Sequence, residues 1–187
     1  MPSKIIGAAI PVLSALLLGG AGVAAAASSQ QFVDEAEIQK LTVNYAKATD
    51  ALGTGDAAQV AAGRELYRRT FTADAQVKAG ESPTLTGPDG WADYVMEALS
   101  RYSTTQHLVG SIDVRLDPPQ GTSEASTGKM TSYLHATHEF EPGGNIWIVL
   151  GTYVDEVVRT PEGWRISRRT LVFTSSETRE HKPAATP

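Results

Sequence analysis

Three of the chain's four histidines, His107, His135 and His138, are the side chains best suited to proton chemistry. A neutral imidazole can accept a proton near pH 7. His135 and His138 lie three residues apart in a strand-like segment, where residues at that spacing point to opposite faces. They are poorly placed to share a metal, although a metal bound by His107 and one of them stays an alternative. We expect no metal site, and we expect His138 and His181 to be exposed.

Other kinds of catalytic chemistry have no counterpart in the sequence. The chain has no cysteine, which excludes disulfides, thiol nucleophiles and thiolate metal sites. It has no glycine-rich phosphate loop or dinucleotide fingerprint, and it has neither a G-x-S-x-G elbow nor an H-E-x-x-H pair.

Helical periodicity dominates the first half of the chain. Residues 33–52 predict a helix with Asp34 as N-cap, because apolar side chains recur there at spacings of three and four. These side chains are Ile38, Leu41, Tyr45, Ala48 and Leu52. A second helix is predicted over 57–70, and a third over 91–100 after a turn at 87–90.

Strand patterns dominate the second half. A short strand is predicted at 72–80, and longer strands at 104–116, 129–140, 145–159 and 163–174, the last two forming a hairpin. Helices followed by long strands predict an α+β domain with the helices on one face of a curved antiparallel sheet.

Four motifs in this order carry a resemblance. They are E-I-Q-x-L-x-x-x-Y-A-x-A-x-D, F-T-A-D-A, T-T-Q-H-L-V and the hairpin GTYVDE…GWRISRR. Together, over about Glu35 to Phe173, they resemble the SnoaL-like branch of the nuclear transport factor 2-like superfamily. The resemblance implies a cone-shaped, cystatin-like α+β barrel, in which a strongly bent antiparallel sheet wraps around the helices and encloses a mostly apolar pocket.

The resemblance also implies catalytic residues. Scytalone dehydratase, bile acid dehydratases and hexachlorocyclohexane dehydrochlorinase remove a small molecule without a cofactor, using a histidine–aspartate dyad. By similarity the dyad is His107 and Asp50, and a carboxylate on the second ring nitrogen would fix the tautomer of the base. From periodicity alone, Asp50 would be a solvated residue at a helix end. Tyr45 occupies the position of a lysine in the dehydrochlorinase, which favours loss of an oxygen-bearing fragment; the alternative is that it only packs.

Further residues are implied to bind substrate. In the predicted strand 129–140, His135 and Tyr133 fall on the same face, and we expect this polar row to face the pocket. The alternative is that it lies on the outer face of the sheet. Arg169 could anchor a carboxylate or an oxyanion, and its alternative is an ion pair with Asp155 or Glu156.

The hairpin contributes two more predicted pocket residues. Tyr153 and Leu171 are expected to line the pocket, and Trp164 and Ile166 are expected to pack outside it.

These residues favour a cofactor-independent lyase acting on a small apolar alcohol, aromatic or polycyclic, in aromatic compound catabolism. It would be a dehydratase, or would break a C–C bond and release an aldehyde such as formaldehyde. The alternatives are an isomerase or hydrolase with a carboxylate base, or a non-catalytic module that binds a small ligand. A homo-oligomer is implied by similarity, a trimer in preference to a dimer.

The N-terminus resembles a secretory signal peptide. Lys4 precedes a long apolar run that ends in small residues, so cleavage is expected after Ala27 and the protein is expected in the periplasm or outside the cell. An uncleaved anchor is disfavoured by Pro11 and several glycines. Residues 28–174 would then be one domain, with 175–187 as a flexible polar tail. Removing Lys4 changes the net charge from −5 to −6, so neither nucleic acid nor membrane is an expected partner.

Overall fold

Helices come first and long strands follow. The computed structural model describes residues 19–117 and 125–180, with side chains from Ser29 onward. In chain order the elements are α1 (Gly19–Gly53), α2 (Ala57–Thr70), β1 (Phe71–Ala79), β2 (Leu85–Thr86), α3 (Gly87–Leu99), β3 (Thr104–Asp117), β4 (Thr127–Glu139), β5 (Ile146–Thr160) and β6 (Gly163–Arg179). This order confirms the predicted α+β class.

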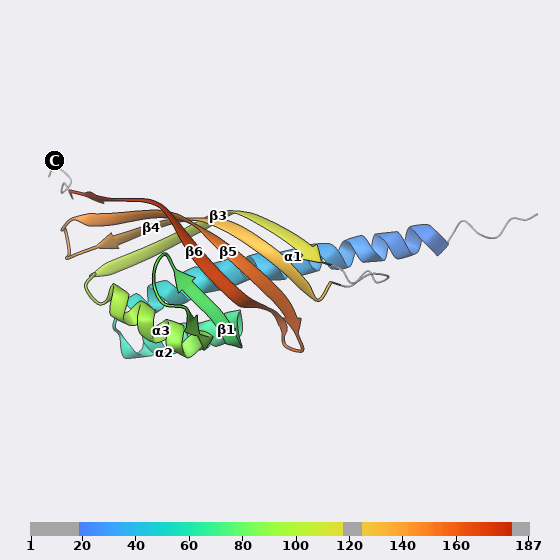
Figure 1. The fold of residues 1–187 in the computed structure, drawn as a ribbon, viewed down its shortest axis with the longest axis horizontal. Coiled ribbons are helices and arrows are strands. Elements are labelled where there is room, and N and C mark those ends of the chain that lie inside the picture. Colours follow the sequence, from blue (N-terminus) through green and yellow to red (C-terminus); the bar gives the residue numbers. More distant parts are fainter. Residues whose placement is uncertain (1–18, 118–124, 181–187) are drawn as a thin grey trace, which may run out of the picture.

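The strands form one curved, unclosed sheet in the order β2-β1-β6-β5-β4-β3. The expectation of a wholly antiparallel sheet was wrong at one position, because β1 pairs with β6 in parallel. β1 follows a helix instead of a hairpin turn, so no tight turn dictates its direction. The other neighbours are antiparallel. The three helices lie against one face of this sheet, and α1 runs along it and extends beyond it (Figure 1).

The apolar stripe of α1 was predicted correctly, and its start was not. The stripe residues from Ile38 to Leu52 are all buried and pack against the sheet. The helix begins at Gly19, so Asp34 is an interior residue and not an N-cap. Its buried carboxylate accepts a hydrogen bond from Gln30 and pairs with Arg159 at 2.5 Å.

The predicted signal peptide is only partly described. Residues 1–18 lie outside the described residues, and 19–27 belong to α1. No helix in the described part of the chain combines the length and apolar character needed to cross a membrane.

The predicted turn at 87–90 is the first turn of α3. Gly87, at φ 78°, starts the helix, and Pro88 occupies its N-terminal turn. Proline is favoured there because the first N–H groups of a helix have no partner within the helix. The Gly-Pro-Asp-Gly signal therefore marked a helix start.

Strand β6 contains a bulge that controls which of its side chains face inward. Val157 of β5 pairs with Ile166, whereas Glu156 pairs with Arg168, so Ser167 is an extra residue. A bulge of this kind reverses the alternation of side chains beyond it. Trp164 and Ile166 before the bulge, and Arg169 and Leu171 after it, are consequently all buried. The expectation that Trp164 and Ile166 pack outside was wrong because strict alternation ignores the extra residue.

The end of β6 also differs from expectation. The strand continues to Arg179 instead of ending at Thr174, and residues 175–179 pair with the start of β5. Because Ile146–Leu150 offers these residues ladder partners, their polar composition does not prevent strand formation.

Candidate functional site

His107 and Asp50 form a hydrogen-bonded pair at the contact between β3 and α1. His107 Nδ1 lies 2.7 Å from Asp50 Oδ1. The other carboxylate oxygen accepts the backbone N–H of His107 at 3.2 Å, and the Thr105 hydroxyl donates to Oδ1 at 3.4 Å. The His107 side chain is 8% exposed and that of Asp50 31%. Three contacts therefore hold the carboxylate against the ring.

A glycine permits this approach. Gly53, three residues after Asp50, ends α1. A Cβ on Gly53 would lie 2.9 Å from the Thr105 hydroxyl oxygen, closer than side chains pack. The missing side chain therefore lets β3 lie against the end of the helix, where Asp50 faces His107.

The pair sets the tautomer of His107. An ionised carboxylate only accepts hydrogen bonds, so Nδ1 carries the proton. Nε2 is then left with its lone pair, on the side of the ring away from Asp50. This assignment follows from the hydrogen-bond network, and it makes Nε2 the atom that could accept a proton.

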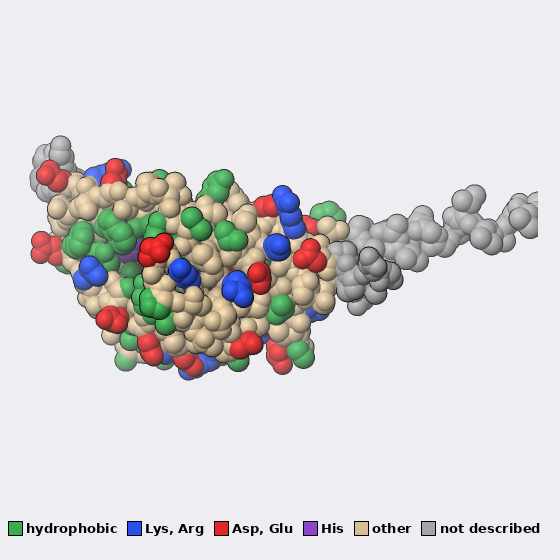
Figure 2. All heavy atoms as spheres, in the orientation of Figure 1, with side chains coloured by type: hydrophobic (Ala, Val, Ile, Leu, Met, Phe, Trp, Pro, Cys, Tyr) green, Lys and Arg blue, Asp and Glu red, His purple; other side chains and the backbone are tan. Residues whose placement is uncertain are grey.

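His107 lines a cavity of about 160 Å³ between the helices and the inner face of the sheet, and this cavity is open on one side to the surface. Most of its wall is apolar or aromatic, with Trp91 from α3 and Tyr153 from β5 among the larger side chains. The side of the molecule in Figure 2 carries a recessed histidine among hydrophobic side chains.

His138 is the residue that the sequence analysis missed. It was expected to be exposed, but only 4% of its surface is accessible, and its ring lies 5.4 Å from the ring of His107 in the same cavity. Its Nδ1 lies 3.4 Å from the Trp147 carbonyl oxygen and must donate to it. Burial, followed by the nearby His107, lowers the pKa of His138 from 6.5 to about 4. The ring is therefore neutral at pH 7.

A signal for His138 was present in the sequence. Along β4, His138 lies on the same face as Met130, Leu134 and Ala136, which are apolar and buried. That row faces the core of a half-buried strand, and His138 is its continuation. Assigning the polar row to the pocket placed His138 on the wrong face.

Tyr45 is buried and borders the cavity. Its hydroxyl accepts a hydrogen bond from Trp91 Nε1 at 3.3 Å. Since an indole N–H can only donate, the hydroxyl hydrogen of Tyr45 is left to donate elsewhere. The Tyr45 ring stacks on Tyr67 and meets Tyr153 edge to face, so its position is fixed.

Arg169 does not line the cavity. Its guanidinium makes two hydrogen bonds to Asp155, at 2.8 and 2.7 Å, and both side chains are buried. It lies 4.1 Å from the Tyr45 ring centroid and 4.3 Å from that of Tyr153. Burial alone would lower the pKa of Arg169, but Asp155 raises it overall. The expectation that Arg169 anchors a substrate anion was therefore wrong. Arg169 instead forms the ion pair with Asp155 that was the alternative.

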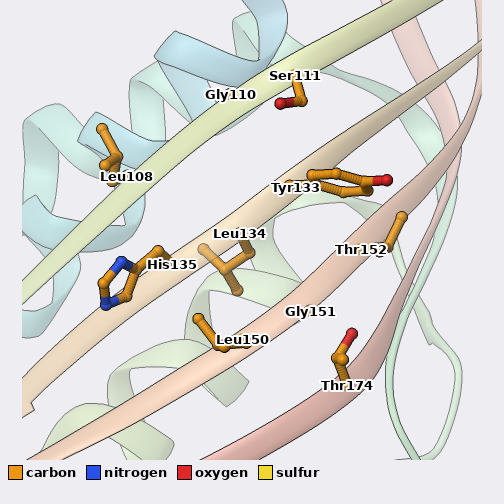
Figure 3. A pocket seen from close by; sticks show the side chains of 10 residues that line it. All are labelled: Leu108, Gly110, Ser111, Tyr133, Leu134, His135, Leu150, Gly151, Thr152 and Thr174. Carbon is orange, nitrogen blue, oxygen red and sulfur yellow. The ribbon is translucent and has the colours of Figure 1, made fainter.

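His135 and Tyr133 lie on the outer face of the sheet. Both are exposed, whereas Leu134 between them is buried. They border a groove of about 520 Å³ that runs over β3, β4 and β5, with the helices behind the sheet (Figure 3). The predicted inward-facing polar row on β4 was therefore wrong, and the outer-face alternative holds. Tyr153 and Leu171 both border the interior cavity.

The described residues contain no group of three or more histidine, aspartate or glutamate side chains placed to bind a metal ion.

Comparison with known proteins supports the same fold. A SnoaL-like domain model matches residues 30–170. An uncharacterized protein of Mycobacterium tuberculosis is 28% identical over 146 residues, which covers 76% of this chain and 86% of that protein.

Solved structures with this fold include lyase-type proteins. A proposed scytalone dehydratase of Novosphingobium aromaticivorans is 19% identical with a TM-score of 0.62, covering 86% of this chain and 99% of that one. A hexachlorocyclohexane dehydrochlorinase of Novosphingobium barchaimii is 15% identical with a TM-score of 0.65, at the same coverage. At these identities the likeness concerns the fold. Because the family model spans most of the chain, the protein belongs to the SnoaL-like family.

Proposed function

We propose that this protein is a cofactor-independent lyase in which His107 is the general base and Asp50 orients it. The observation that carries the proposal is the 2.7 Å contact between His107 Nδ1 and Asp50 Oδ1 at the wall of a mostly apolar cavity. Nε2 accepts the substrate proton, and the carboxylate stabilises the imidazolium that forms.

Elimination of water from an alcohol fits these groups. Nε2 of His107 removes a proton from the carbon next to the carbinol carbon, and the electrons of that C–H bond form the double bond as the C–O bond breaks. The departing oxygen takes a proton from Tyr45, which borders the same cavity, and leaves as water. The Tyr45 hydroxyl suits this step because it accepts the hydrogen bond from Trp91 and therefore keeps its own hydrogen as a donor.

The same groups could break a C–C bond. His107 would then remove the hydroxyl proton, and the O–H electrons would form the carbonyl of a departing aldehyde as the C–C bond breaks. The electrons of that C–C bond would stay on the carbon left behind, which would take a proton from Tyr45. Formaldehyde would be the aldehyde released from a primary alcohol. Product assays distinguish the two reactions, because loss of water gives an alkene and C–C cleavage gives an aldehyde.

An isomerase or hydrolase with a carboxylate base is less well supported. Such a mechanism needs a carboxylate facing the cavity by itself, but Asp50 is bound to His107 and does not border the cavity. A binding module without catalysis would use the cavity but would need no oriented base.

The test is a screen of cyclic alcohols for two products. Alkene formation is detected by ultraviolet absorption, and aldehyde release is assayed separately. We expect turnover by the wild type, its loss in His107→Ala, and no change in His135→Ala, which removes a histidine from the outer face. Equal turnover by His107→Ala would refute the mechanism, and no turnover together with ligand binding would favour a binding module.

We also propose that the protein is exported after cleavage at Ala27. The leader sequence supports this. Mass spectrometry of the N-terminus from a fractionated host cell tests it: a periplasmic protein starting at Ser28 is expected, and a cytosolic protein with an intact N-terminus would contradict it.

A further inference from the structure

The interior cavity limits the size of a ligand. Its volume is about 160 Å³, and cavities of about 150 Å³ in protein cores accept benzene. One six-membered ring with a short substituent therefore fills the cavity, whereas a fused second ring must either displace the wall or extend out past its edge, where Phe173 is half exposed.

The wall also limits the charge of a ligand. None of the described residues that border the cavity is aspartate, glutamate, lysine or arginine. Arg169, which could have met an anion, is committed to Asp155 by two hydrogen bonds. A carboxylate entering the cavity would lose its hydration without gaining a cation. His138 does not compensate, because burial keeps its ring neutral at pH 7.

The polar groups of the wall are few and lie close together. The ring centroids of His107 and His138 are 5.4 Å apart, and Tyr45 borders the same space. Thr49 contributes little, since its hydroxyl is bonded to the Tyr45 carbonyl and to Tyr67. A ligand with one hydroxyl group on an apolar ring matches this arrangement.

We infer that the cavity takes a neutral alcohol built on a single six-membered ring, and that it excludes carboxylates and fused polycyclic molecules. The choice of an alcohol rests on the proposed lyase function, whereas the limits on size and charge rest on the cavity. This narrows the substrate class expected from the sequence, which included polycyclic alcohols.

Phe173 is the residue through which the size limit can be changed. It borders the cavity but is 49% exposed, so removing its ring costs less core packing than removing a fully buried one. Its ring lies over Gly80, where an added Cβ would come within 2.6 Å of it. Val172 is a matched control, because it is its neighbour, is 50% exposed and does not border the cavity.

The experiment measures ligand binding to the full chain by calorimetry and by quenching of tryptophan fluorescence, since Trp91 and Trp147 border the cavity. The probes are benzyl alcohol, benzoate and 1-naphthalenemethanol. Neither alcohol has a hydrogen on the carbon beside its carbinol carbon, so neither can lose water during the measurement. Both are primary alcohols, so formaldehyde release is assayed in parallel to detect C–C cleavage. We expect benzyl alcohol to bind at least about tenfold more tightly than the other two.

The variants make the size limit testable. Phe173→Ala should gain affinity for 1-naphthalenemethanol, and Val172→Ala should behave as the wild type. Benzoate or 1-naphthalenemethanol binding as tightly as benzyl alcohol in the wild type would overturn the inference, as would no binding by any probe. Selective binding without elimination of any alcohol would refute the lyase proposal alone. Turnover of a fused polycyclic alcohol would refute the size limit alone.

Discussion

At the scale of single residues, the pairing of Asp50 with His107 is the feature on which the chemistry depends. The carboxylate takes three hydrogen bonds, from Thr105 and from the ring and backbone of His107. Those bonds fix both the ring orientation and the tautomer, so a change at Asp50 should act on catalysis more than on the fold.

Asp50→Asn should reduce kcat by about 10²- to 10⁴-fold, because an amide neither fixes the tautomer nor stabilises the imidazolium as a carboxylate does. Steady-state kinetics with an alcohol from the screen measure this. The matched control is Asp113→Asn on the exposed side of β3, which should keep wild-type kcat. A wild-type kcat in Asp50→Asn would argue against the dyad.

His138 should make the stability of the fold depend on pH. Its folded pKa is about 4, below the ordinary value of 6.5, so the unfolded chain binds a proton more readily in that range. The contribution of the neutral His138 ring to the free energy of unfolding is therefore complete above pH 6.5, and it is lost as the pH falls toward 4. Between pH 7 and 4.5 the wild type should lose about 2 kcal/mol more unfolding free energy than His138→Gln.

Urea denaturation at several pH values measures this difference. His135→Gln, on the outer face, should follow the wild type at every pH. Parallel stability curves for the wild type and His138→Gln would show that burial does not hold the ring neutral.

At the scale of elements, β5 and β6 are joined inside the fold by Asp155 and Arg169. Both side chains are buried, and Arg169 packs between the rings of Tyr45 and Tyr153. Buried pairs of this kind stabilise little compared with apolar packing, but removing one partner leaves an uncompensated charge. Nearby on the same two strands, the exposed pair of Arg168 and Glu156 provides a comparison.

Arg169→Leu should therefore destabilise the protein by about 3–5 kcal/mol, whereas Arg168→Leu should change stability by less than about 1 kcal/mol. Chemical denaturation of both variants at pH 7 gives the two values. Adding Asp155→Leu to Arg169→Leu should recover part of the loss, since no charge is then left unpaired. Equal effects of the two arginine substitutions would contradict the buried pair.

Periodicity predicted most elements because each has a regular apolar face. The α1 stripe and the span of α2 needed no tertiary information. Inward and outward faces were harder to predict, since a one-residue bulge at Ser167 reverses the alternation and no local signal marks it. The dyad came from family resemblance, because Asp50 lies off the apolar stripe. His138 was missed when the polar row of β4 was assigned to the pocket.

At the scale of the whole molecule, the outer face of the sheet exposes several large apolar side chains. Leu108 and Tyr133 are 67% and 62% exposed, and Leu150 is 40% exposed. They border the outer groove (Figure 3). An exposed apolar face of this kind is typical of an interaction surface, which supports the proposal of a homo-oligomer. The preference for a trimer over a dimer rests on the family resemblance alone.

Analytical ultracentrifugation tests this assembly. The wild type should sediment as a homo-oligomer, and Tyr133→Asp should shift it toward the monomer by placing a charge on the outer face. Val43→Asp, at a 47% exposed position on α1, should sediment as the wild type does. A monomeric wild type at micromolar concentration would refute the proposal.

The central claim, that Asp50 prepares Nε2 of His107 to accept a proton, can be measured without knowing the substrate. Nitrogen-15 NMR of the histidine rings at pH 7 distinguishes a protonated from an unprotonated ring nitrogen. The predicted result for His107 is a proton on Nδ1 and a free lone pair on Nε2, with that preference lost in Asp50→Asn. A proton on Nε2 in the wild type would contradict the account, because the atom that faces away from Asp50 could then not act as the base.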